Sequence, residues 1–238
     1  MFHLTNSAGI ALIVLLLPTA AHAEDANAAS HSPAPQNQSI YAPSTDEISA
    51  YELKLRIGPG DPAAGRDKAE MCFGCHGEDG NSPDPQFPKL SGQYGIYMTK
   101  QMRNYLYNTR SHQMMGDIAV AVSDEDLDDI SAYFASQPMM KGDHPSTNKT
   151  GKKLYDNNDL SRMMVRCKNC HGPTGKGLDP GNPVNPVIGG QHKEYLLEQL
   201  INFREGVRSN STGGLMNTTV HQLSDKELEG LSDYISGL

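Results

Sequence analysis

The four cysteines of the chain all belong to one short pattern, Cys-x-x-Cys-His, which occurs twice. The two copies are Cys72, Cys75, His76 and Cys167, Cys170, His171. Paired thiols at this spacing can form thioether bonds to the vinyl groups of a porphyrin, and the adjoining imidazole can bind its iron. The pattern therefore predicts two covalently attached haem c groups, with His76 and His171 as iron ligands.

Other uses of paired cysteines explain less of this pattern. A structural zinc site would use four thiols, but it gives no reason for a histidine directly after each pair. A disulfide framework gives no such reason either. A thioredoxin-like redox pair needs a strand before the motif and a helix after it, and neither copy has that context.

The similarity between the two halves of the chain extends well beyond the cysteines. At an offset of 98 positions the matches are Gly92/Gly190, Gln93/Gln191, Tyr97/Tyr195, Gln101/Gln199, Tyr105/Phe203 and Arg110/Arg208. At an offset of 101 they are Met115/Met216, Ser123/Ser224, Asp124/Asp225, Leu127/Leu228 and Tyr133/Tyr234. A repeat near 100 residues is too long for a solenoid unit, so it predicts a duplicated domain.

Both repeats carry helical patterns. Apolar or aromatic residues recur at three- and four-residue spacing in 97–106 and 195–203. Ser123 and Ser224 each precede an acidic residue by three positions, which resembles a capping box at the start of a final helix. No long alternation with period two indicates a sheet, and the predicted fold class is all-α.

The first 23 residues resemble a secretory signal peptide. They contain no Lys, Arg, Asp or Glu, and the apolar run from Ile10 to Leu17 leads to the small-residue site Ala21-His22-Ala23. Cleavage is expected after Ala23, although the missing basic residue leaves an uncleaved anchor open as the alternative. Export agrees with haem attachment, which takes place on the oxidising side of a bacterial membrane.

Residues 24–60 are expected to form a disordered, flexible tether and a short added segment. Up to residue 45 they are rich in Ala, Ser, Pro, Asn and Gln, and they cannot bury enough apolar surface to offset chain entropy. The apolar pattern of 46–57 would fit an added helix on the first domain.

The remaining residues suit two small domains, 61–140 and 141–238. Each is expected to begin with a helix, at about 62–71 and from about 152. Neither contains Trp, so a covalently held macrocycle would complete a thin core. The net charge is −6 over 61–140 and +1 over 141–238. This acidic balance disfavours nucleic-acid binding and would orient the first domain toward a basic partner.

A second iron ligand decides whether such a site transfers electrons or binds small molecules. Met115 and Met216 are the candidates, because each stands eight residues before the serine of the final helix. A thioether ligand favours ferrous iron and raises the reduction potential. The alternative for any single methionine is core packing, and Met114 competes with Met115.

Other residues could orient the axial histidines or compete with the two methionines as iron ligands. Pro88 and Pro186, which are equivalent at the 98-residue offset, are expected to offer backbone carbonyls to the axial histidines. The alternative is that each proline only shapes a turn. His112 and His221 lie near the methionines but lack counterparts in the other repeat. We expect the side chains of His144 and His192 to be exposed to solvent. Five further methionines are expected to pack in the core: Met71, Met98, Met102, Met163 and Met164.

The chain resembles the dihaem cytochrome c4 family, exported bacterial proteins made of two class I cytochrome c domains. The resemblance rests on Cys72–Gly77, Asp79–Asn81, Phe87–Leu90, Gly92–Gln93, Met115 and Ser123–Leu127, and on Cys167–Gly172, Gly189–His192, Phe203–Gly206, Met216 and Leu223–Asp225. It implies tandem domains packed with pseudo-twofold symmetry, and His/Met ligation by the pairs His76/Met115 and His171/Met216. The departures are the segment before Asp61, an insertion at 156–164, and Val187-Ile188 in place of Lys89-Leu90.

The leading hypothesis is a periplasmic, non-enzymatic electron carrier of a Gram-negative bacterium. By resemblance, it would pass single electrons from a respiratory donor, such as a cytochrome bc1 complex or a copper protein, to a terminal oxidase or similar acceptor. The alternative is the cytochrome subunit of a periplasmic dehydrogenase or of a thiosulfate dehydrogenase-like enzyme. A dihaem peroxidase would need one haem open to peroxide, which two methionine ligands argue against. Membrane association would come through the partner or an uncleaved N-terminus.

Overall fold

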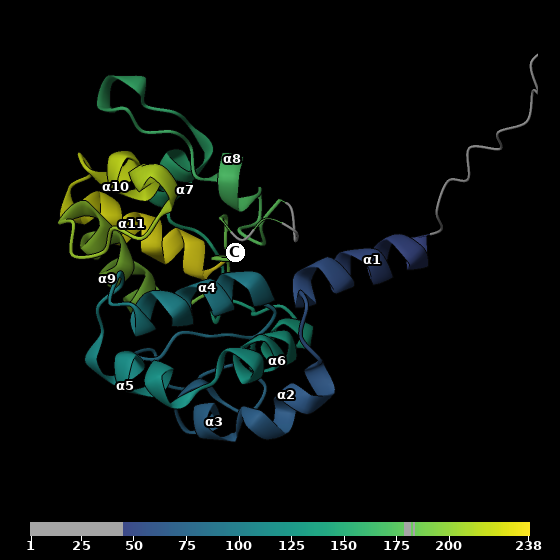
Figure 1. Cartoon of the computed structure of the whole chain (residues 1–238). Coiled ribbons are helices and arrows are strands. Elements are labelled where there is room, and N and C mark those ends of the chain that lie inside the picture. Colours follow the sequence, from purple (N-terminus) through teal and green to yellow (C-terminus); the bar gives the residue numbers. More distant parts are fainter. Residues whose placement is uncertain (1–44, 179–181, 183) are drawn as a thin grey trace, which may run out of the picture. The chain divides into compact units, whose positions relative to one another are not determined.

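The computed structural model describes residues 45–178, 182 and 184–238, with the backbone alone at 45–48 (Figure 1). A first group of helices comprises α2 (Pro62–Lys68), α3 (Glu70–His76), α4 (Gly95–Leu106), α5 (Gln113–Ala121) and α6 (Asp124–Ser136). A second group comprises α7 (Lys149–Asp156), α8 (Lys168–His171), α9 (Lys193–Arg204), α10 (Leu215–Val220) and α11 (Asp225–Ser236), with the 3-10 turns η1 (Leu160–Arg162) and η2 (Thr212–Gly214). Within the described ranges no strand forms, and the all-α prediction is confirmed.

The first group begins where the sequence provides a strong helix start. The Asp61 carboxylate accepts a hydrogen bond from Ala63 N at 2.8 Å, and Pro62 follows as the first helical residue, where a missing N–H costs nothing. The predicted single helix over 62–71 is instead two helices, because the chain bends at Ala69 (φ −83°, ψ −2°). Ala69 is fully buried, so the bend directs α3 against the core.

The final helices of the two groups begin differently. Ser224 and Glu227 form the predicted capping box at the start of α11. In the first group the predicted box is wrong: Ser123 caps Asp126 N, but the Asp126 carboxylate accepts from the Ser123 hydroxyl and not from its backbone N–H. Aspartate is one methylene shorter than glutamate, so its carboxylate does not reach back to the backbone.

Equivalent helices pack in the same way in both groups. In the first, α2 and α4 pack on α6 around Met98, Ile130, Tyr133 and Phe134. In the second, α7 and α9 pack on α11 around Leu154, Tyr155, Leu231 and Tyr234. The repeat found in the sequence is therefore a repeat of packed structure.

Two methionines that were expected in the core are exposed instead. Met71 is 48% exposed and Met163 is 58% exposed. Met163 lies in the tight turn closed by the bridge between Asp159 and Met164 and has a φ of 55°. Neighbouring residues of such a turn face opposite ways, so the burial of Met164 leaves Met163 outside. In α3 the buried side is that of His76, and Met71 lies off this side.

The stretch before the first group forms α1 (Thr45–Ile57), which packs on α4 and α6. Arg56 Nη2 donates to Gln137 O at 3.3 Å and ties the end of α1 to the end of α6. The predicted signal peptide (1–23) and the tether up to residue 44 lie outside the described residues, and the predicted domain boundaries stay predictions. Among the helices that are described, none has both the length and the apolar character needed to cross a membrane.

Asp129 joins α6 to the start of the first group. Its Oδ1 accepts Asp61 N at 2.8 Å, and its Oδ2 accepts Lys68 Nζ at 2.7 Å. The Lys68 hydrogen bond, followed by the backbone hydrogen bond, holds the pKa of Asp129 below its usual value. A carboxyl with a depressed folded-state pKa stabilises the fold above its unfolded pKa, and this stabilisation is lost as the pH falls.

We therefore expect Asp129→Asn to lower the thermal unfolding midpoint of the haem-loaded protein at neutral pH. The difference from wild type should shrink as the pH falls from about 5 to about 2. The control is Asp67→Asn, which removes a carboxylate that is 86% exposed and should have little effect throughout. An Asp129→Asn effect that is independent of pH would show that the charge contributes nothing.

Candidate haem sites

Each predicted axial histidine ends a short helix that also carries its second cysteine. His76 is the last residue of α3, His171 is the last residue of α8, and both are 7% exposed. His76 Nδ1 lies 2.9 Å from Pro88 O, and His171 Nδ1 lies 2.9 Å from Pro186 O. Both repeats thus hold an imidazole against a proline carbonyl in the following loop.

This contact decides which ring nitrogen carries the proton. A carbonyl oxygen only accepts hydrogen bonds, so Nδ1 must be the donor. Burial lowers the pKa of His76 and of His171, against the opposing effect of the carbonyl contact, so both rings are neutral at neutral pH. The Nε2 atom therefore keeps its lone pair, and none of the described residues forms a hydrogen bond with it. Such a nitrogen is a suitable ligand for haem iron.

The four thiols are half-buried, and none is in a disulfide. Cys72 borders the core of the first group and Cys167 that of the second. Burial, reinforced by the neighbouring Cys75, raises the pKa of Cys72 to about 11, and burial raises the pKa of Cys167 to about 12. Reactive redox pairs have a lowered thiol pKa, so this environment argues against a thioredoxin-like function.

The zinc alternative lacks a ligand set in the part of the chain that the structure describes. No three His, Cys, Asp or Glu side chains converge there in a way that could hold a metal ion. The residues present do fit covalent haem. Each half offers two thiols and a neutral imidazole with an available nitrogen, all beside an apolar core.

Met115 and Met216 both lie in the first turn of a helix, Met115 in α5 and Met216 in α10. Met115 N donates to His112 Nδ1 at 3.3 Å at the start of α5, and Met216 N donates to Ser211 Oγ at 3.2 Å near the start of α10. Both methionine side chains are half-buried, whereas Met114 is 49% exposed. Met216 also borders the second core, as Cys167 does. The role of both methionines as iron ligands stays a prediction.

Residues repeated at the 98-residue offset contact each other across the two groups. Gln93 Nε2 donates to Val187 O at 2.8 Å, and its Oε1 accepts Val187 N at 3.0 Å. The equivalent Gln191 Nε2 donates to Lys89 O at 2.9 Å, and its Oε1 accepts Lys89 N at 2.8 Å. Each contact is repeated when the two groups are exchanged, which is the pattern of a twofold interface.

In the sequence these glutamines are recognisable only as markers of the repeat, and their role at the interface was missed. A signal was available, because a buried glutamine needs a partner for both ends of its amide, and both copies are 5% exposed. The partner itself lies 94 or 102 positions away and could not be read from either repeat alone.

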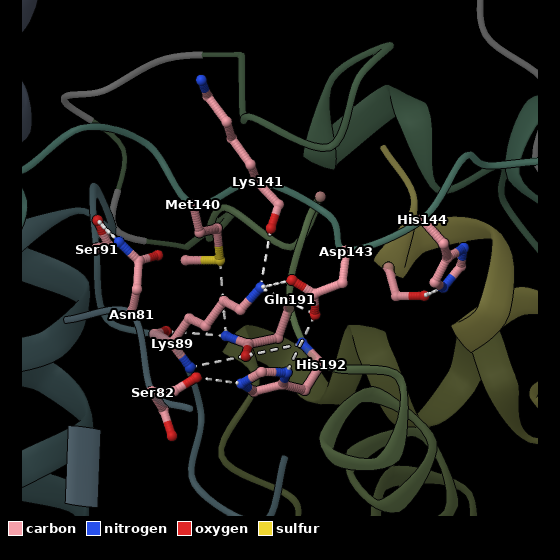
Figure 2. Close-up of polar contacts among 12 residues, drawn as sticks. Asn81, Ser82, Lys89, Ser91, Met140, Lys141, Asp143, His144, Gln191 and His192 are labelled. Atoms are coloured by element: carbon pink, nitrogen blue, oxygen red, sulfur yellow. Dashed lines mark hydrogen bonds and ion pairs between the residues drawn. The ribbon is translucent and has the colours of Figure 1, made fainter. Parts of the chain in front are cut away.

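The segment between the two groups is held by a polar cluster (Figure 2). Lys89 Nζ donates to Lys141 O at 2.8 Å and lies 3.2 Å from Asp143 Oδ1. His192 Nε2 lies 2.9 Å from Ser82 O. The expectation that His192 is solvated is wrong, because it is 8% exposed within the contact between the groups.

Lys89 has no lysine counterpart in the second repeat. The equivalent Val187 is 2% exposed and packs with Tyr94 and Met140. The two repeats therefore carry different residues at this position because the two sides of the interface have different surroundings. On one side a lysine reaches the connecting segment, and on the other a valine fills an apolar cluster.

Comparisons with known proteins agree with this architecture. The family model for cytochrome c matches residues 62–138 and 149–238. Cytochrome c4 of Pseudomonas aeruginosa is 42% identical over 77% of this chain and 92% of its own length. The crystal structure of reduced recombinant cytochrome c4 from Pseudomonas stutzeri matches with 40% identity and a TM-score of 0.70, over 76% of this chain and all of that chain. A thiosulfate dehydrogenase electron acceptor of Stutzerimonas stutzeri is 31% identical over 71% of this chain and 80% of its length.

Two helical domains, each with a Cys-x-x-Cys-His motif and a buried imidazole oriented by a proline carbonyl, define a two-domain c-type cytochrome. The chain belongs to the cytochrome c family, among the cytochromes c4. It carries two covalently bound haem c groups and is an electron carrier, not an enzyme.

The contact between the domains can be tested at Gly177, which lies against Tyr94 of the other domain. A Cβ added at this position would clash with Tyr94 Oη, and the backbone has a φ of +83°. Gly206 has a similar φ of +75°, but a Cβ added there would meet no atom within 4 Å. Alanine at either site meets the same backbone strain, but only Gly177→Ala adds a steric clash.

We expect Gly177→Ala to reduce the free energy of unfolding by about 1–3 kcal/mol more than Gly206→Ala does, which is the usual cost of overpacking. Denaturant unfolding of the haem-loaded protein measures the difference. Equal losses in the two variants would contradict the close approach of Tyr94 to this loop.

Proposed function

We propose that this protein carries single electrons in the periplasm of a Gram-negative bacterium, from a respiratory donor to a terminal oxidase or similar acceptor. The observation that carries the proposal is the pair of buried, neutral histidines, each with an available Nε2 beside two thiols. When bound, haem supplies a one-electron ferric–ferrous couple. The similarity to cytochromes c4 of Gram-negative bacteria supports the location.

The proposal assigns His76 and Met115 to the iron of the first domain, and His171 and Met216 to that of the second. The proline carbonyls hold each imidazole in one orientation and increase its basicity as a ligand. A thioether at the remaining iron position would leave no site for a substrate and would favour the ferrous state. Both features suit an electron carrier.

Redox protein partners follow from the family, and their identity is part of the proposal. A cytochrome bc1 complex or a copper protein would be the donor, and a terminal oxidase the acceptor. The net charge of −6 over residues 61–140 would steer a partner with a basic face toward the first domain.

A second candidate function is electron acceptance from a thiosulfate-oxidising enzyme. It is favoured by the relative named thiosulfate dehydrogenase electron acceptor, which is more distant than the cytochromes c4. Stopped-flow reduction of the oxidised protein by a cytochrome bc1 complex and by a thiosulfate dehydrogenase would separate the two functions. The proposal expects faster reduction by the bc1 complex.

The ligand assignment predicts the effect of removing one sulfur at a time. Met115→Ala should open one iron, so that one of the two ferrous haems binds carbon monoxide and its reduction potential falls. Met216→Ala should do the same at the other haem. Carbon monoxide titration and redox titration, both followed by absorption, measure these changes.

Met114→Ala is the matched control, because this methionine is adjacent to Met115 and exposed. It should leave both haems closed to carbon monoxide and keep the weak far-red band that a thioether ligand gives to ferric haem. If Met114→Ala opens a haem and Met115→Ala does not, the assignment is wrong.

A further inference from the structure

A buried tyrosine hydroxyl binds the peptide that follows His171. Tyr155 lies on α7 and is fully buried, and its Oη donates to Gly172 O at 2.6 Å. Burial raises the pKa of Tyr155, so the phenol keeps its proton and acts as the donor. The carbonyl that it binds belongs to the residue directly after the axial histidine, at the end of α8.

This carbonyl is part of a tight turn, residues 172–175. Gly172 O also accepts Gly175 N at 3.3 Å, and Gly172 has a φ of +78°, in the region that favours glycine. Within the described part of the chain, no side chain other than Tyr155 donates to a carbonyl of this turn. The hydroxyl therefore supplies the side-chain contact that holds the turn against α7.

The same turn positions the loop that carries Pro186. Ile188, two residues after Pro186, donates its N–H to Gly175 O at 2.8 Å. Pro186 O lies 2.9 Å from His171 Nδ1. A series of hydrogen bonds thus connects the Tyr155 hydroxyl, through the turn and the proline loop, to the imidazole.

The first domain has no tyrosine at the equivalent position. Gly65 on α2 and Gly151 on α7 correspond, because a Cβ added at either would clash with a backbone carbonyl of the last helix of its domain. Four residues further on, the first domain has Ala69 and the second has Tyr155. In the first domain Phe73 packs against two aromatic rings of α6 instead. Phenylalanine has no hydroxyl to donate.

The turn after His76 is consequently supported in a different way. Gly77 O accepts Gly80 N at 3.1 Å, which is the same backbone contact as in the second domain. Among the described residues, however, no side chain donates to Gly77 O. Tyr133 Oη donates to Glu78 O, one residue further along, at 2.8 Å. The two axial histidines therefore contact the same kind of carbonyl but have different support behind it.

We propose that Tyr155 is a positioning residue for the haem of the second domain and lowers its reduction potential. Its hydroxyl holds the turn and so keeps the Pro186 carbonyl against the Nδ1 proton of His171. This contact makes the imidazole a more basic ligand, and a more basic ligand stabilises ferric iron. The first domain lacks this hydroxyl, so Tyr155 is one source of a difference between the two potentials. The inference rests on the proposed function, because it needs His171 as a ligand of the second iron.

The test uses Tyr155→Phe in the full, haem-loaded protein. Only the hydroxyl is removed, and Gly172 O keeps its hydrogen bond from Gly175 N. The second haem should shift toward the ferrous form by about threefold, which is about 28 mV for a one-electron couple. The first haem should keep its potential. Redox titration followed by nuclear magnetic resonance of the haem methyl groups measures the two haems separately.

Nuclear magnetic resonance of the reduced protein with nitrogen-15 in its histidines gives a second measurement. The His171 Nδ1 proton should exchange with solvent roughly fivefold faster in Tyr155→Phe, the factor expected from the loss of one hydrogen bond. The His76 Nδ1 proton should exchange at the wild-type rate. A role of Tyr155 limited to core packing would leave both the potential and this exchange unchanged.

Tyr234→Phe is the matched control. Tyr234 is 5% exposed in the same domain, and its ring centre lies 5.6 Å from that of Tyr155. Its hydroxyl forms no hydrogen bond with residues 172–175, all of which the structure describes. This variant removes the same atom from the same aromatic pair, so it should leave both potentials and both exchange rates unchanged.

An unchanged potential of the second haem in Tyr155→Phe would overturn the proposal, and so would an unchanged His171 exchange rate or an equal change in Tyr234→Phe. The failure of the ligand assignment would look different. The His171 ring nitrogens of wild-type ferric protein would then lack the paramagnetic shift that bound iron imposes. That shift persists if only the role of Tyr155 is wrong.

Discussion

A buried imidazole can serve as an iron ligand only if its proton is kept on the other ring nitrogen. In both domains the backbone meets this requirement through a carbonyl at a proline, 2.9 Å from Nδ1. The loop that supplies the carbonyl is closed by Leu90 N donating to Gly80 O in one domain and Ile188 N donating to Gly175 O in the other. The short helix, the loop and the burial of the histidine together orient one lone pair.

The duplicated domain uses the same residue types twice, once for each side of the contact between domains. A glutamine that pairs with the backbone of the other domain in one repeat does so again in the second. The buried Arg110 and Arg208 are also reciprocal, because each donates a hydrogen bond to a tyrosine of the other domain. The rule is broken at Lys89 and Val187. There the connecting segment occurs only once along the chain, so only one side has a lysine to hold it.

Much of the site was readable from local sequence. The cysteine pairs, the axial histidines and the repeated prolines are identified by type and spacing, because thioether formation and iron ligation demand those groups. Errors arose where a residue's surroundings come from distant segments. His192 follows a Gly-Gly-Gln run and is of a type that is often solvated, yet the other domain covers it. Met163 is suited to the core by its type, yet a tight turn leaves it exposed.

The amino-acid sequence by itself determined which groups can attach a haem and bind its iron, and that the chain has two such sites. Covalent attachment and helix formation depend on groups within a few residues of each other, so their patterns can be read directly from the sequence. The tertiary structure alone decided how the two domains meet and which charges are buried between them. Those contacts join residues about 85 to 111 positions apart, and their energy depends on burial, which no local pattern records.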